Sequence, residues 1–294
     1  MVQVKLAVYG AGGCSGCEVS LLEDPAGFME LAVYTRVSFW PLLTNSRLAG
    51  LKGQPDGSVD LAILCGSLRT ELDLEVAELM RRKSRYLLAA GSCALWGGVP
   101  ALADLPPGFR GPPADPSVPP LLSRVLPVRE AVRVDEEVPG CPPLPGQLLS
   151  KILEISGLRE PASPGMEENT ALCLTCPRKS EQRSFARWLR PPEVLPAEGC
   201  FLNRGLACSG PATRGGCGAR CPAAGQPCRG CYGPLPGVTD QGARLLGALG
   251  EVLDPGCPEG EQPATGAVDL AGTFYRYTLA GTTVARVPGK DEGR

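Results

Sequence analysis

The chain contains 14 cysteines and no histidine. This combination excludes a Ser-His-Asp triad, a Cys-His protease pair, a histidine-ligated haem and every mixed Cys/His zinc site. Three uses of cysteine remain: a framework of disulfides, zinc held by thiolates alone, or iron-sulfur clusters. The chemistry of the chain therefore depends on how its thiols are grouped.

The N-terminal sequence favours a reducing compartment. Residues 1–5 read MVQVK and lead into a glycine-rich turn by Gly10, without the basic start, apolar stretch and cleavage site of a secretory signal. The long uncharged stretch at residues 86–103 is broken by glycines and a proline, so it predicts a buried strand followed by a loop. We expect a cytoplasmic protein with no membrane span, in which Cys-x-x-Cys spacings favour metal over disulfide.

The charge of the chain is nearly balanced. Lys and Arg number 29 against 31 Asp and Glu, which gives a net charge of -2. A global basic field, on which non-specific nucleic-acid or anionic-membrane binding relies, is not present. We therefore expect no nucleic-acid partner.

Apolar runs of strand length alternate with helical patterns in the first half of the chain. The expected strands are residues 4–9, 59–64 and 86–90, and the expected helices are residues 18–29, 68–83 and 147–157. Strands that alternate with helices predict an α/β fold with a doubly wound, largely parallel sheet. Ligands of such sheets bind beyond the carboxyl ends of the strands.

Cysteines follow those predicted strand ends. Cys14 and Cys17 come after the first strand, Cys93 follows residues 86–90, and Cys141 follows the apolar run at residues 132–134. Glycine and proline surround them and would let the backbone approach a bulky inorganic group and present amide donors to sulfur. The sequence therefore predicts that these thiols converge on one edge of the sheet.

The second half has a different composition. A proline-rich stretch at residues 105–120 predicts an exposed loop or insertion, and the regular alternation ends near residue 160. Eight cysteines then fall between residues 173 and 231 with little apolar material, so we expect bound metal to organise this region. A helix at residues 240–253 and an extended tail at residues 272–278 follow. The predicted domains are residues 1–160, 161–237 and 238–294.

The later cysteines are enough for two further sites of four thiolates, with Cys65 and Cys257 left over. They are Cys173, Cys176, Cys200, Cys208, Cys217, Cys221, Cys228 and Cys231. Zinc also accepts four thiolates, so the count alone does not choose iron.

Several motifs together resemble the small subunits of nickel-iron hydrogenases, in the cytoplasmic methyl-viologen-reducing, deazaflavin-non-reducing branch. In the first half these are GGCSGC at residues 12–17, GSCA at 91–94 and PGCPP at 139–143. In the second half they are CLTCPR at 173–178, ACSGPAT at 207–213, CRGCYGP at 228–234 and GTFYRYTL at 272–279. The resemblance covers almost the whole chain. It implies a flavodoxin-like first domain followed by a loop-rich iron-sulfur domain.

The resemblance also implies three 4Fe-4S clusters held by cysteine alone. The proximal cluster would be held by Cys14, Cys17, Cys93 and Cys141. The medial cluster would be held by Cys217, Cys221, Cys228 and Cys231, and the distal cluster by Cys173, Cys176, Cys200 and Cys208. Respiratory relatives have histidine in place of Cys173 and proline in place of a fourth medial thiolate, and Cys221 departs most from their spacing.

This family keeps its nickel-iron centre in a separate large subunit, so the resemblance implies an electron conduit with no catalytic residue of its own. Electrons from hydrogen oxidation would pass through the clusters to a small 2Fe-2S subunit and a heterodisulfide-reductase-type flavoprotein. Two other functions stay open: the cluster subunit of a respiratory-complex-like quinone oxidoreductase, and a zinc-stabilised interaction module. Adjacent cysteines in place of the Cys14-x-x-Cys17 pair are typical of the quinone-reducing family, which also lacks the later eight.

Some residues near the predicted clusters have two interpretations. Related small subunits usually carry an acid where this chain has Cys65, which is either a spare ligand or, as we favour, a small buried hydrophobe. Glu18 either relays protons or complements a helix dipole, and we favour the dipole. Trp96 either shields a cluster or packs in the core. The arginines of the cysteine-rich region either offset cluster charge and mark a docking face or are solvated; they are Arg204, Arg214, Arg220 and Arg229.

Overall fold

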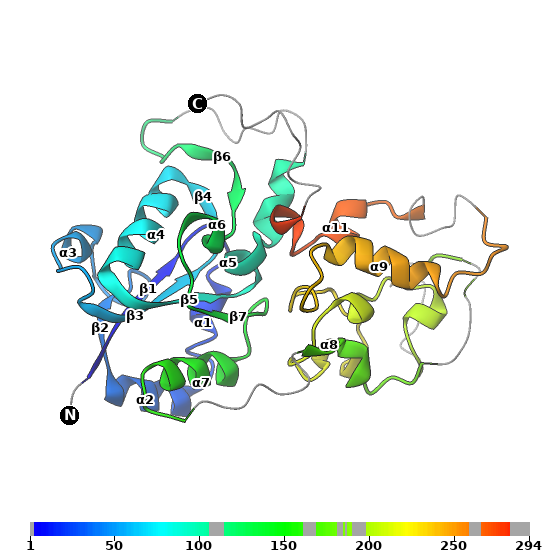
Figure 1. Ribbon diagram of the computed structural model, residues 1–294, viewed down its shortest axis with the longest axis horizontal. Helices are drawn as coiled ribbons and strands as arrows, with labels where there is room; N and C mark the ends of the chain where they lie inside the picture. The colour runs from blue at the N-terminus through cyan, green and yellow to red at the C-terminus, as the bar shows by residue number, and fades with distance from the viewer. Residues whose placement is uncertain are drawn as a thin grey trace. The chain divides into compact units, whose positions relative to one another are not determined.

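The computed structural model describes residues 3–105, 115–160, 169–180, 185, 187–189, 198–258 and 266–282, and these divide into two compact units on either side of residue 163. Figure 1 shows a sheet with helices in the first unit and short elements joined by loops in the second. Part of the proline-rich stretch, residues 106–114, lies outside the described residues. The division into three domains stays a prediction.

The first unit is built on a five-stranded sheet with the order β2-β1-β3-β5-β7, in which every neighbouring pair is parallel. Its strands are β1 (Val4–Gly10), β2 (Thr35–Phe39), β3 (Val59–Cys65), β5 (Ser84–Ala90) and β7 (Glu136–Val138). A separate antiparallel pair joins β4 (Leu68–Thr70) to β6 (Leu121–Leu126). The order confirms the predicted flavodoxin-like, doubly wound α/β fold.

Helices cover both faces of this sheet. They are α1 (Gly16–Val19), α2 (Pro25–Tyr34), α3 (Leu48–Lys52), α4 (Glu71–Lys83), α5 (Ser92–Trp96), η1 (Val99–Asp104), α6 (Val128–Ala131) and α7 (Pro145–Ile155). One core cluster packs α4 and α6 on the strands through Val76, Met80 and Val128. The other packs α2 and α7 on the opposite face through Leu31 and Leu148.

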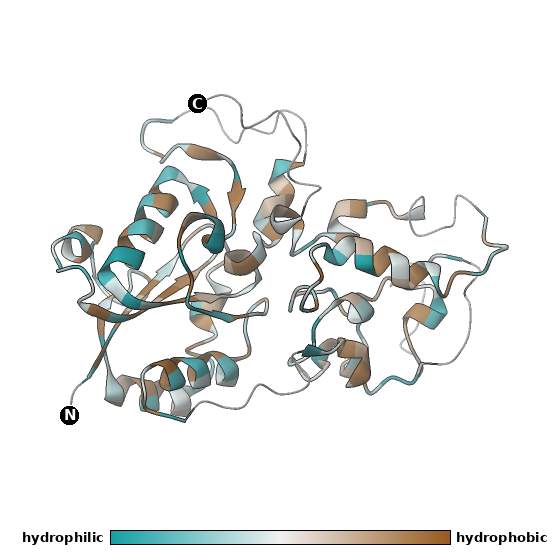
Figure 2. Ribbon diagram, in the orientation of Figure 1, coloured by the Kyte–Doolittle hydropathy of each residue, from teal (hydrophilic) through white to brown (hydrophobic). Residues whose placement is uncertain are grey.

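Alternate residues of the central strands enter the two cores. On β3, Ala62 and Leu64 belong to the core under α4, whereas Leu61 and Ile63 belong to the core under α2 and α7. Both sets are buried, and for this reason the strands are apolar along most of their length. Figure 2 shows polar and apolar residues alternating along α4, which covers one face only.

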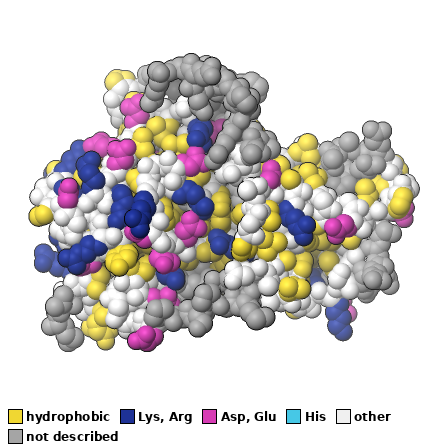
Figure 3. Space-filling model, in the orientation of Figure 1, with side chains coloured by type: hydrophobic (Ala, Val, Ile, Leu, Met, Phe, Trp, Pro, Cys, Tyr) yellow, Lys and Arg dark blue, Asp and Glu magenta, His cyan; other side chains and the backbone are white. Residues whose placement is uncertain are grey.

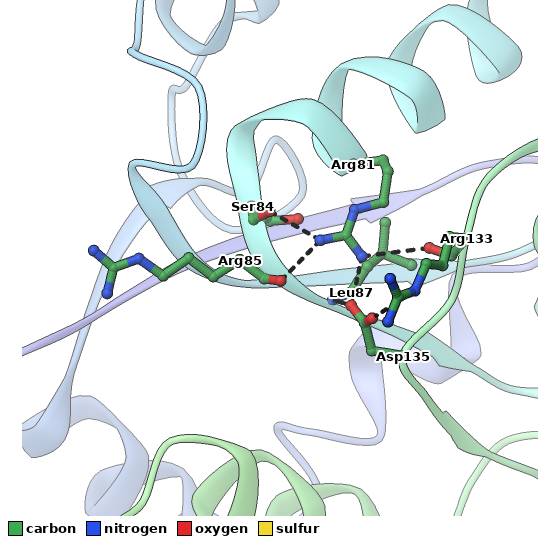
Figure 4. Close-up of polar contacts among 6 residues, drawn as sticks. All are labelled: Arg81, Ser84, Arg85, Leu87, Arg133 and Asp135. Carbon is green, nitrogen blue, oxygen red and sulfur yellow. Dashed lines mark hydrogen bonds and ion pairs between the residues drawn. The ribbon is translucent and has the colours of Figure 1, made fainter.

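An arginine fixes β5 to β7 at the amino end of these strands. Arg81 lies in the last turn of α4 and donates hydrogen bonds to the carbonyls of Ser84 and Arg85 and to the carboxylate of Asp135, as Figure 4 shows. The same carboxylate accepts the backbone N–H of Leu87 at 2.9 Å. Basic side chains gather over this part of the first unit in the space-filling view (Figure 3).

The second unit contains short helical segments and two longer ones. They are η3 (Leu172–Leu174), η5 (Leu202–Arg204), η6 (Gly210–Ala212), α8 (Arg220–Ala223), α9 (Gln241–Gly250), α11 (Leu270–Phe274) and η8 (Leu279–Gly281). An apolar core includes Leu172, Phe201, Leu245, Leu249 and Phe274. The cysteine-rich region therefore shares an apolar core with α9 and α11, and that bound metal also organises it stays a prediction.

Several expected elements need correction. The helix expected at residues 18–29 is two helices, because Asp24 caps a new helix at Pro25. Residues 68–70 are a strand, since the Thr70 capping box begins α4 at Glu71. The tail expected to be extended at residues 272–278 contains α11, whose backbone N–H at Gly272 is capped by Asp269.

Two strands of the sheet, β2 and β7, were not predicted from the sequence. β2 is short and only partly buried, and β7 contains two glutamates among its three residues. Residues 132–134, the run that precedes Cys141 in the sequence, do not form a strand. The strand before Cys141 is β7, which begins at Glu136. In the part of the chain that the structure describes, no helix is long and apolar enough to span a membrane.

Candidate metal centres

The loop that carries Cys14 and Cys17 is fixed to the loop after β3. The backbone N–H of Ala11 donates to the carbonyl of Cys65 at 2.8 Å. Gly12 and Ser67 then exchange two backbone hydrogen bonds, each 2.8 Å long. Main-chain groups therefore set the course of the chain as it leaves β1 and approaches the two thiols.

The loops that carry Cys93 and Cys141 are joined in the same way. The N–H of Gly91 donates to the carbonyl of Val138 at 2.8 Å. The carbonyl of Gly140 accepts from both the N–H and the hydroxyl of Ser92, at 2.8 and 2.9 Å. The ends of β5 and β7 thus continue as a pair into the loops that present these cysteines.

The charges of the first four thiols affect one another's pKa values. Burial raises the pKa of Cys93 to about 12, and the negative charges of Cys17, Cys141 and Cys14 raise it as well. Burial also raises the pKa of Cys141, again with contributions from Cys17 and Cys14. The charges of these thiols therefore act on one another, and that the four hold one cluster stays a prediction.

Glycines leave room beside these sulfurs. Gly91 has φ +91°, and a Cβ there would collide with Sγ of Cys17. Gly98 has φ +58°, and a Cβ there would collide with Sγ of Cys93. Only glycine satisfies both the backbone conformation and the space. Soft thiolates with bare backbone around them suit an iron-sulfur cluster, so the residues present fit the group that the motifs imply.

A second group of thiols lies in the second unit. Burial raises the pKa of Cys173 to about 12, with further contributions from the charges of Cys208, Cys200 and Cys176. A Cβ at Gly210 would lie 2.9 Å from Sγ of Cys173 and 3.8 Å from Sγ of Cys208. Gly210 therefore lies beside two sulfurs of the predicted distal set, and the union of all four stays a prediction.

Backbone donors reach the sulfurs of this unit. Burial raises the pKa of Cys208 to about 11, while the N–H groups of Gly210 and Cys228 lower it. The N–H of Cys228 lies 3.3 Å from Sγ of Cys208, and the N–H of Gly230 lies 3.4 Å from Sγ of Cys228. Such N–H···S contacts stabilise negative charge on ligand sulfurs.

The four remaining thiols form two pairs. Burial raises the pKa of Cys217, the N–H groups of residues 219 and 220 lower it, and the charge of Cys221 raises it. Burial raises the pKa of Cys228 well above its ordinary value, and the charges of Cys208 and Cys231 add to this. The union of both pairs in one set stays a prediction.

Every cysteine of the chain lies among the described residues, and none of them forms a disulfide. No three or more Cys, Asp or Glu side chains of the described part are grouped so as to hold a metal ion.

Glu18 and Trp96 are both buried. Glu18 lies in the first turn of α1, and its carboxylate accepts a hydrogen bond from Nε1 of Trp40 at 2.9 Å. Burial raises the pKa of Glu18, and the bond from Trp40 lowers it. Trp96 belongs to the core under α4, as the packing interpretation expects.

Arginines join the loops of the second unit through hydrogen bonds to backbone carbonyls. Arg178, inside a cysteine motif but not singled out by the sequence, donates to the carbonyls of Pro222 and Gly199 and stacks over Phe201 at 4.0 Å. Arg214 donates to the carbonyl of Tyr232 at 2.7 Å. Both contacts join segments that carry different cysteines.

Arg229 does not join loops in this way; it lines a cavity of about 230 Å³ together with Trp188, Asp269 and Arg276.

Gln241 is a structural residue that the sequence analysis did not identify. Its buried amide donates to Thr213 Oγ1 at 3.0 Å and to the carbonyl of Gly230 at 3.2 Å. Only its position after the helix-capping Asp240 distinguishes it in the sequence.

Comparisons with known proteins agree with this arrangement. Residues 14–155 match the family described as NADH ubiquinone oxidoreductase, 20 Kd subunit. The chain is 31% identical to a subunit of the F420-non-reducing hydrogenase of Methanothermobacter marburgensis, over 94% of each protein. It is 30% identical to the iron-sulfur subunit of the F420-non-reducing hydrogenase of Archaeoglobus profundus, over 96% of this chain and 98% of that protein.

A solved structure shares the fold. The recombinant [NiFeSe] hydrogenase from Desulfovibrio vulgaris Hildenborough aligns with a TM-score of 0.50 and 18% identity, over 80% of this chain and 94% of that one.

The parallel sheet and the full-length relatives define the class of protein as an oxidoreductase component, a subunit of a hydrogenase. More narrowly, the chain belongs to the family of F420-non-reducing hydrogenase G subunits.

Proposed function

We propose that this chain is the electron-transfer small subunit of a cytoplasmic nickel-iron hydrogenase and holds three 4Fe-4S clusters. The proximal set is Cys14, Cys17, Cys93 and Cys141; the medial set is Cys217, Cys221, Cys228 and Cys231; the distal set is Cys173, Cys176, Cys200 and Cys208. The observation that supports the proposal is that Gly91 and Gly98, both with positive φ, leave room beside the sulfurs of Cys17 and Cys93, and that the charges of the other three proximal thiols act on Cys93.

Bound clusters would supply one-electron carriers, and the chain itself does the rest. Its main-chain hydrogen bonds fix the loops, its cysteines provide the ligands, and its N–H groups compensate charge on sulfur. Cys208 and Cys228 are buried, which limits the access of water to these two sulfurs and strengthens the action of nearby dipoles on them.

The proposed partners follow from the same family. A nickel-iron large subunit would supply electrons from hydrogen, and a 2Fe-2S subunit with a heterodisulfide-reductase-type flavoprotein would accept them. No residue of this chain is proposed to be catalytic. A transfer chain with several carriers is reasonable because no single carrier need then span the whole distance between donor and acceptor.

Metal analysis tests the proposal. Anaerobically purified full-length protein should be brown and contain about twelve irons per chain, four for each predicted cluster. Cys141→Ser, Cys176→Ser and Cys231→Ser should each alter a different electron paramagnetic resonance signal. Cys257→Ser is the matched control and should leave all signals unchanged. A colourless protein that contains zinc would instead identify a structural module.

The match of residues 14–155 to a ubiquinone oxidoreductase family leaves a second oxidoreductase to test. The relatives that align along the whole chain are hydrogenase subunits, which favours the hydrogenase. The complex of this chain with its proposed nickel-iron large subunit, purified together, should reduce methyl viologen in the presence of hydrogen. Quinone reduction without hydrogen consumption would contradict the assignment.

A further inference from the structure

Two backbone N–H groups of the second unit contact sulfurs that belong to two different proposed clusters. The N–H of Cys228 lies 3.3 Å from Sγ of Cys208, a proposed distal ligand. The N–H of Gly230 lies 3.4 Å from Sγ of Cys228, a proposed medial ligand. Hydrogen bonds to ligand sulfurs are among the features that set the reduction potential of a cluster. A residue that fixes the direction of both N–H groups therefore acts on both potentials.

Gln241 fixes the backbone at Gly230. This glycine has φ +88°, and without a side chain its backbone has wide rotational freedom. Nε2 of Gln241 donates to the carbonyl of Gly230 at 3.2 Å, and the N–H of Gly233 donates to the same carbonyl at 2.9 Å. A Cβ at Gly230 would lie 3.1 Å from Nε2, so the amide packs directly against this residue. The bond from Gln241 therefore holds Gly230 in the orientation that points its N–H at Cys228.

The second hydrogen of the same amide leads to Cys208. Nε2 of Gln241 also donates to Oγ1 of Thr213 at 3.0 Å, and that hydroxyl donates to the carbonyl of Ser209 at 2.6 Å. Ser209 directly follows Cys208, and its own N–H donates to the carbonyl of Cys228 at 2.9 Å. These bonds hold the two cysteine segments side by side where the N–H of Cys228 meets Sγ of Cys208. Gln241, Thr213 and Ser209 are all buried, and hydrogen bonds in such low-dielectric surroundings are stronger than in water.

We propose that Gln241 is a positioning residue that aligns the N–H donors on Cys208 and Cys228 and thereby raises the reduction potentials of the distal and medial clusters together. The inference rests on the proposed function. Reduction of a cluster adds negative charge that spreads onto its ligand sulfurs, and a donor aimed at one of them stabilises the reduced state more than the oxidised state. Gln241 acts through Gly230 and Thr213.

A purely structural role makes a different demand on the residue. If Gln241 only stabilised the second unit, any change that weakens the same packing would have the same effect. Leu249 lies on the same helix, α9, and is fully buried in the apolar core. Leu249→Ala weakens this packing and removes no hydrogen bond. It therefore separates a loss of stability from a loss of alignment.

The test uses the full-length protein, purified anaerobically with its clusters and titrated electrochemically while electron paramagnetic resonance is recorded. Cys231→Ser first identifies the medial signal, and Cys176→Ser identifies the distal one. Gln241→Leu should then shift the midpoints of both signals to lower potential. Gln241→Glu, which keeps the size of the side chain and loses the amide donors, should do the same. The proximal signal should not move, and Leu249→Ala should leave every midpoint at the wild-type value.

Thr213 provides a second test, of the path to Cys208. Thr213→Val keeps the shape of the side chain but removes the hydroxyl that joins Gln241 to Ser209, so it should lower the distal midpoint in the same titration. Thr213→Ser keeps the hydroxyl and should leave that midpoint near the wild-type value. Equal distal midpoints in the two variants would contradict the path.

The outcomes separate the inference from the function on which it rests. If Gln241→Leu and Gln241→Glu keep full iron content and the wild-type midpoints, the positioning role is wrong although the clusters stand. If Leu249→Ala shifts the medial and distal midpoints as much as Gln241→Leu does, Gln241 is a structural residue only. If neither Cys231→Ser nor Cys176→Ser changes the iron content or any signal, the medial and distal clusters themselves are refuted.

Discussion

Nε1 of Trp40 donates a hydrogen bond to Oε1 of Glu18 in the interior of the first unit, and Glu18 directly follows Cys17, a proposed cluster ligand, in the chain. The carboxylate is buried, and a Cβ at Gly10 would collide with it from the other side. Glycine at the end of β1 and tryptophan after β2 therefore together accommodate an acid in the core.

Trp40→Phe should weaken the fold because it removes this donor and leaves the buried carboxyl without it. We expect the free energy of unfolding to fall by about 1–3 kcal/mol, measured by urea denaturation. Glu18→Gln keeps an acceptor for the indole and should cost less. An equal loss in both variants would contradict this prediction, because Glu18→Gln keeps both the indole ring and an acceptor for its N–H.

Gly91→Ala should disturb the first set of thiols. The added methyl group would collide with Sγ of Cys17, in a backbone conformation that already disfavours alanine. We expect the loss of about four irons per chain, measured by metal analysis. Gly57→Ala is the matched control, since Gly57 also has positive φ but nothing within 4 Å of an added Cβ. Full iron content in Gly91→Ala would contradict the prediction.

Asp135→Asn should make the protein less stable near neutral pH. Burial alone would raise the pKa of Asp135, but the hydrogen bond from Arg81, the N–H of Leu87 and the charges of Arg81 and Arg133 lower it overall. A carboxyl whose folded pKa is depressed contributes stability above its unfolded pKa and loses it as pH falls through the folded pKa.

Urea denaturation at several pH values checks this effect. The wild-type protein should lose stability below about pH 4, the ordinary pKa range of an aspartate, and Asp135→Asn should lose less over the same interval. Glu23→Gln, at an exposed position of the same unit, is the control and should leave the acid profile unchanged. Identical acid profiles of wild type and Asp135→Asn would exclude the role of this carboxylate.

Gln241→Leu should loosen the second unit. The buried amide holds Thr213 and Gly230 together, and leucine would leave the carbonyl of Gly230 without this donor. We expect the free energy of unfolding to fall by about 1–3 kcal/mol. Gln226→Leu, at an exposed position, should have little effect in the same denaturation experiment.

The sequence predicted the strands and helices whose apolar pattern is long. Residues 59–64 and 86–90 are strands because both sheet faces are covered, and this appears as a continuous apolar run. β7 is too short and too acidic for such a signal and is recognised only by its pairing with β5. Residues 68–70 form a strand because of a partner at residues 121–126, distant in the sequence.

The same limit applies to the candidate site. The apolar runs before Cys14, Cys17 and Cys93 are strands, as predicted, whereas Cys141 follows β7 and not the run at residues 132–134. The union of these four thiols in one set stays a prediction. The burial of Cys65 depends on the register of β3 against its neighbours, which no local pattern contains. Trp40 likewise reaches Glu18 only through the fold.

Main-chain hydrogen bonds hold the loops that carry the first four cysteines, joining Gly12 to Ser67 after β3 and Gly91 to Val138 of β7. Apart from the glycines that leave room for neighbouring atoms, most side chains on these loops are therefore not needed to keep the frame in place. Mutation can therefore adjust the surroundings of the thiols during evolution while the frame persists.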